Sequence, residues 1–179
     1  TNGAGFNFSH RYGAGFVNAA AAVALARAWI SLGTEVSATR SSTTSGTIPD
    51  NTPAGASRTF GFSSATNIRV ETVEVTVSVT HANRGQLSFE LSSPAGTRTV
   101  LGEARAKDTG ANFTAWTFSS PRHWGESSSG TWTVRVIDAE AGVEGTLTAA
   151  SVTLYGSTAA AAAAPAIATQ RPPPSTRRA

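Results

Sequence analysis

The chain has 179 residues, with 17 glycines and no cysteine or methionine, which is enough for one domain with its own core and additional segments. The lack of cysteine excludes a disulfide framework and a thiolate metal site. The net charge of +3 comes from a terminal stretch that holds Arg171, Arg177 and Arg178. Without a basic face on the remainder, we expect no nucleic-acid partner. No apolar run of about 18 residues is present, so no membrane span is predicted.

Residues 1–33 hold a glycine-rich opening and one alanine-rich α-helix, predicted over residues 16–32. Gly33 is the expected stop, because glycine adopts the left-handed conformation at a helix C-terminus at little cost. The helix needs an apolar neighbour for Val17, Leu25, Trp29 and Ile30. Residues 34–47 are polar and rich in serine and threonine, which predicts a linker or extended connection.

Residues 48–156 change to a period of two, with the clearest alternation over residues 73–80, 87–91 and 132–136. Successive side chains of a strand point to opposite faces, so each run has one buried and one solvated face. Several short strands without a helical period between them predict an all-β, antiparallel β-sandwich.

The last alternating run, over residues 145–155, changes phase at Ala149–Ala150. Leu147 and Val152 share one face only if a β-bulge lies there, because a bulge adds one residue to one strand. The sequence therefore predicts a bulge. Beyond it, residues 157–179 are poly-alanine followed by a proline run that favours polyproline II, which predicts a tail or spacer.

The adjacent pair Ser9–His10 raises the question of catalysis. A serine nucleophile needs a base that a third group orients, and sequence neighbours rarely point at each other in that way. His10, His81 and His123 also lack the spacing of metal ligands. Each histidine is therefore expected to be a structural, hydrogen-bonding residue.

The stretch SHRYGAGFVNAAAAV, residues 9–23, resembles the final segment of the catalytic domain in kexin- and furin-like subtilisin proteases. IPDNTPAG, residues 48–55, resembles the opening of the P domain, or Homo B domain, that follows it in that family. The most specific part is HWGE at residues 123–126, followed by GTWTV at residues 130–134. The resemblance runs in order over nearly all of residues 1–156.

The resemblance implies a galactose-binding-like jelly-roll fold and a division of the chain. Residues 1–33 would be the end of a subtilisin-like catalytic domain, 34–47 a linker, 48–156 the P domain and 157–179 a tail. The implied role is to stabilise and regulate that catalytic domain, a partner in the same polypeptide, in a secreted, extracellular or periplasmic serine endopeptidase. The family's nucleophile motif, Gly-Thr-Ser followed by small residues and proline, is absent from the sequence. We therefore expect no peptidase activity from this chain alone.

The resemblance also suggests structural or interface roles. These fall on His10, Tyr12, His81, Trp116, Trp124 and Trp132. Trp132 alternates with Thr133 and is expected in the core, whereas Trp116 and Trp124 lie on less regular sequence, where either could face a partner domain.

Two residues depart from the family pattern, and the first of them bears on calcium. Gln86 stands where the family tends to have Asp, and Asn112 where it often has Gly; asparagine tolerates a left-handed conformation better than most residues. Calcium is the cofactor that the resemblance suggests, and the remaining candidate ligands are Asp50, Asp108 and Asp138. The alternative is that these aspartates cap turns.

Two other functions fit a jelly roll. One is a carbohydrate-binding module, which would need exposed aromatic side chains beside polar ones; fold alone supports it weakly. The other is an adhesion or secretion module of an extracellular protein.

Overall fold

The computed structural model describes residues 1–9 and 12–158. These residues form one α-helix, α1 (Ala19–Arg27), and nine strands. The strands are β1 (Val36–Ser42), β2 (Gly46–Ile48), β3 (Ala56–Phe62), β4 (Ile68–Thr80), β5 (Leu87–Ser92), β6 (Arg98–Gly102), β7 (Phe113–Ser120), β8 (Gly130–Asp138) and β9 (Gly145–Thr158). Short 3-10 turns, η1 (Ser64–Thr66) and η2 (Arg84–Gln86), precede β4 and β5. Across the described ranges, no helix has the length and apolar character needed to cross a membrane.

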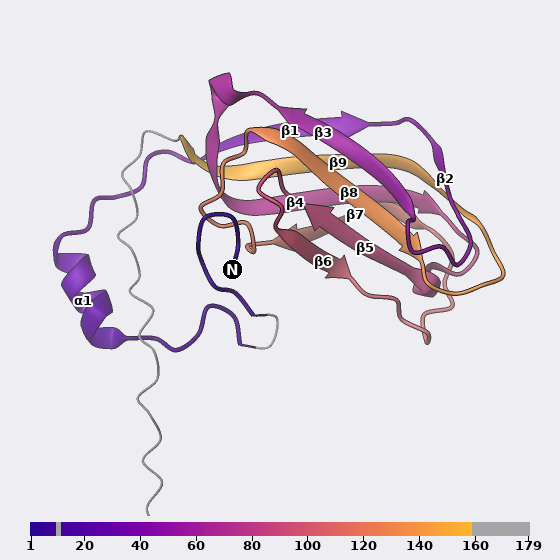
Figure 1. Ribbon diagram of the computed structural model, residues 1–179, viewed down its shortest axis with the longest axis horizontal. Coiled ribbons are helices and arrows are strands. Elements are labelled where there is room, and N and C mark those ends of the chain that lie inside the picture. Colours follow the sequence, from indigo (N-terminus) through magenta and orange to yellow (C-terminus); the bar gives the residue numbers. More distant parts are fainter. Residues whose placement is uncertain (10–11, 159–179) are drawn as a thin grey trace, which may run out of the picture.

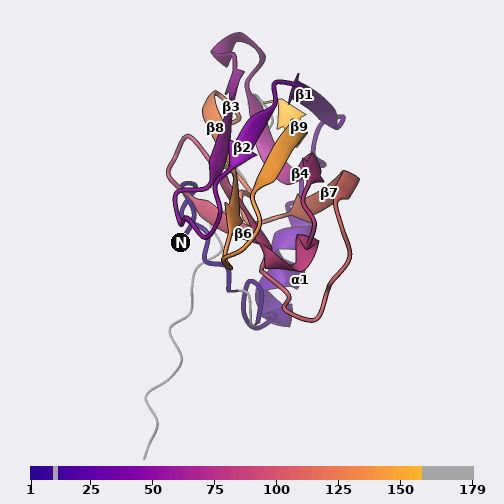
Figure 2. The ribbon, with the colours of Figure 1, turned by 90° about the vertical axis from the view of Figure 1, so that its right-hand side faces the viewer.

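The strands form two antiparallel sheets that pack face to face (Figure 1). One sheet has the order β1-β9-β4-β7, with β2 also pairing with β9, and the other has the order β3-β8-β5-β6. Figure 2 shows the two layers nearly edge-on. The predicted all-β, antiparallel jelly-roll sandwich is confirmed.

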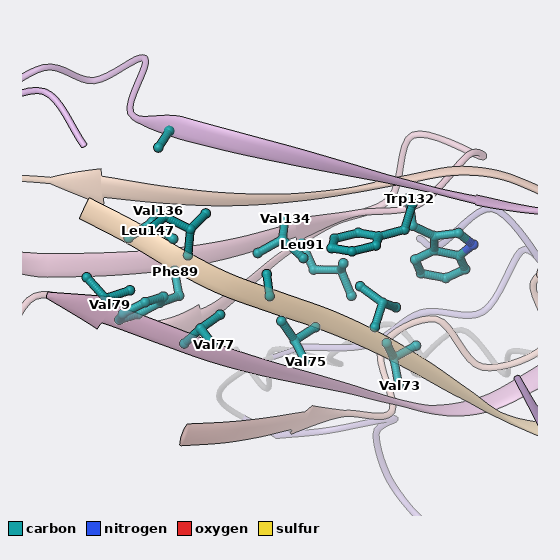
Figure 3. Packing of buried hydrophobic residues seen from close by; sticks show 14 of the residues in the cluster. Val73, Val75, Val77, Val79, Phe89, Leu91, Trp132, Val134, Val136 and Leu147 are labelled. Carbon is teal, nitrogen blue, oxygen red and sulfur yellow. The ribbon is translucent and has the colours of Figure 1, made fainter. Parts of the chain in front are cut away.

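The core lies between the two sheets, where the alternating runs place their apolar side chains (Figure 3). The valines of β4 from Val73 to Val79 expose 2% or less of their surface. Trp132 is fully buried, and its Nε1 donates a 2.9 Å hydrogen bond to the backbone O of Ser128. A buried indole N–H needs such a partner. Trp132 therefore lies in the core, as its alternation with Thr133 predicts.

The predicted bulge in the last strand is confirmed. Along β9, Ala149 pairs with Ser78 but Leu147 pairs with Val79, so Thr148 is the extra residue. Its hydroxyl donates a 3.0 Å hydrogen bond to the backbone O of Ser78. The bulge restores the phase, and Leu147 and Val152 are both fully buried.

The helix is shorter than predicted. It begins after the N-cap Asn18 and ends at Arg27, so Gly33 does not stop it. Figure 1 shows α1 to one side of the sandwich, and none of its residues is buried. A helix without a packing surface gains little from extension through Trp29 and Ile30, which have weaker helix propensity than alanine. Both side chains are exposed.

The segment 34–47, expected as a linker or extended connection, is extended. It supplies β1 and the start of β2, and β1 pairs along its length with β9. Across this pair, the hydroxyls of Thr39 and Thr153 lie 3.0 Å apart within hydrogen-bonding distance. An edge strand with a solvated outer face accepts serine and threonine readily, which explains why its composition suggested a linker. At the other end, β9 includes residues 157–158 of the predicted tail; residues 159–179 lie outside the described residues.

Candidate functional site

Residues 1–8 are bound to the sandwich through the side chain of Asn2. The Asn2 Nδ2 donates to the backbone O of Arg122 at 3.0 Å and of Trp124 at 2.8 Å. Its Oδ1 accepts from the backbone N–H of Ala4 at 3.1 Å and of Phe6 at 2.9 Å. A side-chain amide has two donor hydrogens and two acceptor lone pairs. Asn2 therefore uses all four, two to shape its own segment and two to join it to the sandwich.

Gly3 makes the next contacts. Its backbone N–H donates to Thr97 Oγ1 at 2.8 Å and to Glu126 Oε1 at 2.7 Å. A Cβ atom at this position would lie 2.2 Å from the Cβ of Ala95. Such a distance forbids any side chain, so this approach requires glycine.

Glu126 is the charged centre of this contact, and its side chain is 1% exposed. Oε1 also accepts from the Thr97 hydroxyl, and Oε2 lies 3.3 Å from His123 Nδ1. Burial raises the pKa of Glu126, but hydrogen bonds from His123, Ser93, Thr97 and the Gly3 N–H outweigh burial and lower it to about 2. Glu126 is therefore ionised at neutral pH while residues 1–8 are bound.

We call Thr97, Arg122, His123, Trp124 and Glu126 the N-terminal seat. They come from the β5–β6 and β7–β8 connections. Arg122 Nη1 adds a 3.0 Å hydrogen bond to the backbone O of Phe8. Between Trp124 and Glu126, Gly125 has φ +81°, and a Cβ there would lie 2.7 Å from the ring of Phe6. Glycine thus lets the bound segment approach the seat closely.

His123 and Glu126 of the seat also form a Thr–His–Glu arrangement with Thr99. His123 Nε2 is 3.2 Å from Thr99 Oγ1, and its Nδ1 faces Glu126. The order of groups resembles a catalytic triad, but His123 is fully buried and Thr99 is 3% exposed. The ring also meets Trp132 edge-on, with the centroids 5.0 Å apart. No substrate can reach the Thr99 hydroxyl in this position, so the arrangement is structural.

His81 occupies a second buried hydrogen-bond network. Its Nδ1 accepts from the Asn83 backbone N–H at 3.1 Å, and its Nε2 lies 3.1 Å from Asp138 Oδ2 and 3.2 Å from the backbone O of Val143. With Nδ1 accepting, Nε2 carries the proton. No ring atom is left to activate a nucleophile, so His81 joins chain segments rather than acting as a base.

The candidate calcium ligands lie in three separate settings. Asp50 accepts from the Gly142 backbone N–H, and Asp138 from His81 and from the Glu140 backbone N–H. Asp108 is paired with Arg84 and with Arg105. Among residues 1–9 and 12–158, no three His, Cys, Asp or Glu side chains gather in a way that could hold a metal.

The pKa of Asp108 reflects its partners. Burial raises it, but hydrogen bonds from Gly110 and Arg84 and the charges of Arg84 and Arg105 outweigh burial and hold the pKa below its ordinary value. The charges of Arg84 and Arg105 therefore already balance the negative charge of the Asp108 carboxylate. Gln86 differs: its Nε2 donates to Glu140 at 3.3 Å, while its buried Oε1 has no hydrogen-bond partner in the described part of the chain.

The remaining predicted residues lie at the surface or outside the described residues. Tyr12, Trp116 and Trp124 are exposed, and His10 is outside the described residues. On β7, the Trp116 ring meets that of Phe113 edge-on, with centroids 5.9 Å apart. Asn112, just before β7, has φ +58°, a left-handed conformation that asparagine tolerates better than most residues.

Sequence reasoning missed Asn2, Gly3, Thr97 and Arg122, and it quoted Glu126 only as part of HWGE. The available signals were the Asn-Gly pair in the glycine-rich opening and a glutamate in an otherwise apolar and small-residue motif. Neither signal specifies a partner more than 90 positions away along the chain, so only the folded structure joins them.

Comparison with known proteins shows which family the sandwich resembles. The family model described as "Proprotein convertase P-domain" matches residues 70–154. The chain is 34% identical to proprotein convertase subtilisin/kexin type 7 of Mus musculus over 168 residues, and 34% identical to furin of Bos taurus over 160 residues. These alignments cover 88% and 87% of this chain but 21% and 20% of the relatives. The chain thus spans about a fifth of the length of these curated relatives.

A solved structure extends the likeness to the fold. The crystal structure of the serine protease of Aeromonas sobria matches with a TM-score of 0.75 and 25% identity, over 87% of this chain and 32% of that one. The same protease in complex with its chaperone ORF2 matches with a TM-score of 0.76 and 26% identity, over 88% of this chain and 33% of that one. The chain therefore belongs to the proprotein convertase family of subtilisin-like proteases, and its sandwich is a P domain of that family.

Proposed function

We propose that this P domain stabilises and regulates the catalytic domain of a subtilisin-like serine endopeptidase in the same polypeptide. In this proposal, residues 1–33 are the end of the catalytic domain and residues 36–158 are the P domain. The relatives are proteases about five times longer than the matched region, which leaves room for such a catalytic domain. Because the relatives include furin and other proprotein convertases, we place the protein in the secretory or extracellular environment.

The contact between Asn2–Gly3 and the N-terminal seat carries the proposal. It joins the segment that resembles the end of a catalytic domain to the P domain through four hydrogen bonds, two from the Asn2 side chain and two from the Gly3 N–H. These contacts use backbone groups and a buried charge, which fix one orientation rather than permitting sliding. A catalytic domain whose end includes residues 1–8 would therefore be held in a fixed register against the sandwich.

The exposed apolar side chains add support. Val17, Trp29 and Ile30 flank α1 and are 90%, 49% and 74% exposed. Exposed apolar groups of this size gather at surfaces that meet another domain or protein. Burial of these side chains against the rest of the catalytic domain would gain roughly 1.5–3 kcal/mol for each side chain fully buried.

The test is a full-length protease that contains this chain, compared with a version that lacks residues 36–158. The proposal predicts loss of secreted, active enzyme in the truncated version, with a lower thermal midpoint for any enzyme recovered. A truncated protease of unchanged stability and activity would contradict it.

The isolated chain should hydrolyse no peptide. Peptide turnover that a serine-directed inhibitor blocks would contradict the assignment of catalysis to another domain.

A further inference from the structure

We propose that the N-terminal seat is a peptide-recognition site for a turn that contains Asn-Gly, and that a segment of this kind supplied by another molecule can bind there when residues 1–8 leave. The proposal deepens the proposed function, because it names the chemistry that joins the two domains. It concerns only the isolated chain, so it can fail while the proposed role in the protease stands.

The seat distinguishes asparagine from its near relatives. The Asn2 Nδ2 faces two backbone carbonyl oxygens, of Arg122 and Trp124, while its Oδ1 faces two N–H groups of the segment itself. Aspartate would place an acceptor against the two carbonyls, and a buried acceptor without a donor is strongly unfavourable. An apolar residue would leave all four groups without these partners.

The seat also requires glycine at the next position. The Gly3 N–H reaches Thr97 and Glu126 only because no side chain separates the segment from Ala95, where a Cβ would lie at 2.2 Å. The seat therefore recognises asparagine followed by glycine, because it selects the asparagine by hydrogen bonding and the glycine by the lack of space for a side chain.

The seat is held by the sandwich itself. Gly125 donates a 2.6 Å backbone hydrogen bond to Val70, and Val70 donates a 2.9 Å bond to Glu126. The Trp124 N–H bonds to Pro121, and Thr97 and His123 hold the carboxylate from the sandwich side. The site thus stays organised when residues 1–8 leave, and the departure removes a hydrogen-bond donor from the buried Glu126 carboxylate.

The sandwich holds little of the chain over residues 16–27, so this part of the chain offers little resistance when residues 1–8 leave. Phe16 and Val17 are fully or almost fully exposed, and α1 buries no residue. A peptide of the same sequence would meet the same donors and acceptors, so covalent continuity is not required for recognition.

The test uses the full chain with Gly3→Val, in which the valine side chain cannot occupy the space beside Ala95. A fluorescent peptide with the sequence of residues 1–8 is titrated and followed by anisotropy. We expect binding to the Gly3→Val chain and at least about tenfold weaker binding to the wild-type chain, whose own segment fills the seat. A peptide with Asn2→Asp should bind at least about tenfold more weakly, whereas Asn7→Ala, in an exposed residue of the same segment, should change little.

Adding Glu126→Gln to the Gly3→Val chain should weaken peptide binding, with a denaturant unfolding curve to verify that the sandwich is folded. Equal affinity for the matched and the Asn2→Asp peptides, or no binding to a folded Gly3→Val chain, would overturn the proposal. Should the double variant unfold, the hydrogen-exchange rate of the Gly3 amide provides the second measurement. Asn2→Asp in the full chain should raise that rate and Asn7→Ala should leave it unchanged; equal rates in all three chains would also overturn the proposal.

Discussion

The carboxylate of Glu126 accepts a 2.7 Å hydrogen bond from the backbone N–H of Gly3, which lies 123 positions earlier in the chain. The bond connects a buried charge in the P domain to the segment that precedes α1. Because the same carboxylate also bonds Thr97 and faces His123, its ionised form is favoured only while these donors are in place. Protonation of Glu126 and attachment of the N-terminal segment are therefore coupled.

The first prediction is a loss of stability in acid that depends on Glu126. Its pKa is about 2 in the folded chain, against an ordinary value of 4.5. A lowered folded pKa stabilises the protein above the unfolded value, and this stability falls as the pH drops from about 4.5 toward 2. The wild-type chain should lose about 3 kcal/mol of unfolding free energy in this window from Glu126 alone. Denaturant unfolding at several pH values measures the loss.

Glu126→Gln is the matched variant for this measurement. The amide keeps the size of the side chain but does not titrate, so the loss between pH 4.5 and 2 should be smaller by that amount. At pH 7 the variant should be less stable by roughly 1.5–3 kcal/mol, because it replaces charge-assisted hydrogen bonds. Parallel pH profiles of wild type and variant would show that Glu126 is not the titrating group.

The second prediction compares a buried tryptophan with an exposed one. Trp132 is fully buried and hydrogen-bonded to Ser128, whereas Trp116 is 49% exposed. Trp132→Ala should lower the unfolding free energy by roughly 3–5 kcal/mol through loss of apolar contacts and the cavity left behind. Trp116→Ala should lower it by less than about 1 kcal/mol in the isolated chain. Denaturant midpoints compare the two, and a loss below about 1 kcal/mol for Trp132→Ala would contradict its core position.

Much of the fold could be predicted because the sandwich depends on local alternation. The valines of β4 and the run around Trp132 have one apolar face each, and the phase change near Ala149 required a bulge that the structure contains. β1 escaped prediction because an edge strand needs no apolar alternation when its outer face is solvated. The helix was overestimated for the opposite reason: its apolar residues suggested a packing partner that the described residues do not provide.

The site was less predictable because its partners are distant in sequence. Glu126 lies in the specific motif HWGE, but the sequence around it gives no sign that its carboxylate binds the N–H of Gly3. Asn2 belongs to the glycine-rich opening of the sequence, and only the folded structure shows that its side chain makes four hydrogen bonds. Local patterns predict strands, whereas long-range polar contacts depend on how the loops meet.

The third prediction is weak calcium binding. Asp50, Asp108 and Asp138 already have hydrogen-bond or ion-pair partners, which calcium would have to displace. We expect a dissociation constant no lower than about 10⁻⁴ M, the range of weak extracellular sites. Calorimetric titration of the full chain measures it, with magnesium as the control for nonspecific attraction. Submicromolar affinity would contradict the prediction, and a Gln86→Asp chain would then test whether the Gln86–Glu140 contact is the site.

The last prediction is that α1 exchanges its amide hydrogens rapidly in the isolated chain. It has nine residues, none of them buried, and isolated helices shorter than about 12–15 residues are marginal in water. The Asn18 cap and the single basic residue in its last turn, Arg27, add too little to hold it. We expect fast exchange over residues 19–27 and slow exchange over residues 73–79, where β4 lies between two paired strands. Measurements at high dilution exclude protection by self-association, and equal protection of both segments in the monomer would show that α1 has a packing surface after all. The same experiment on the full-length protease should find α1 protected, because its exposed apolar neighbours Trp29 and Ile30 would then be covered by the catalytic domain.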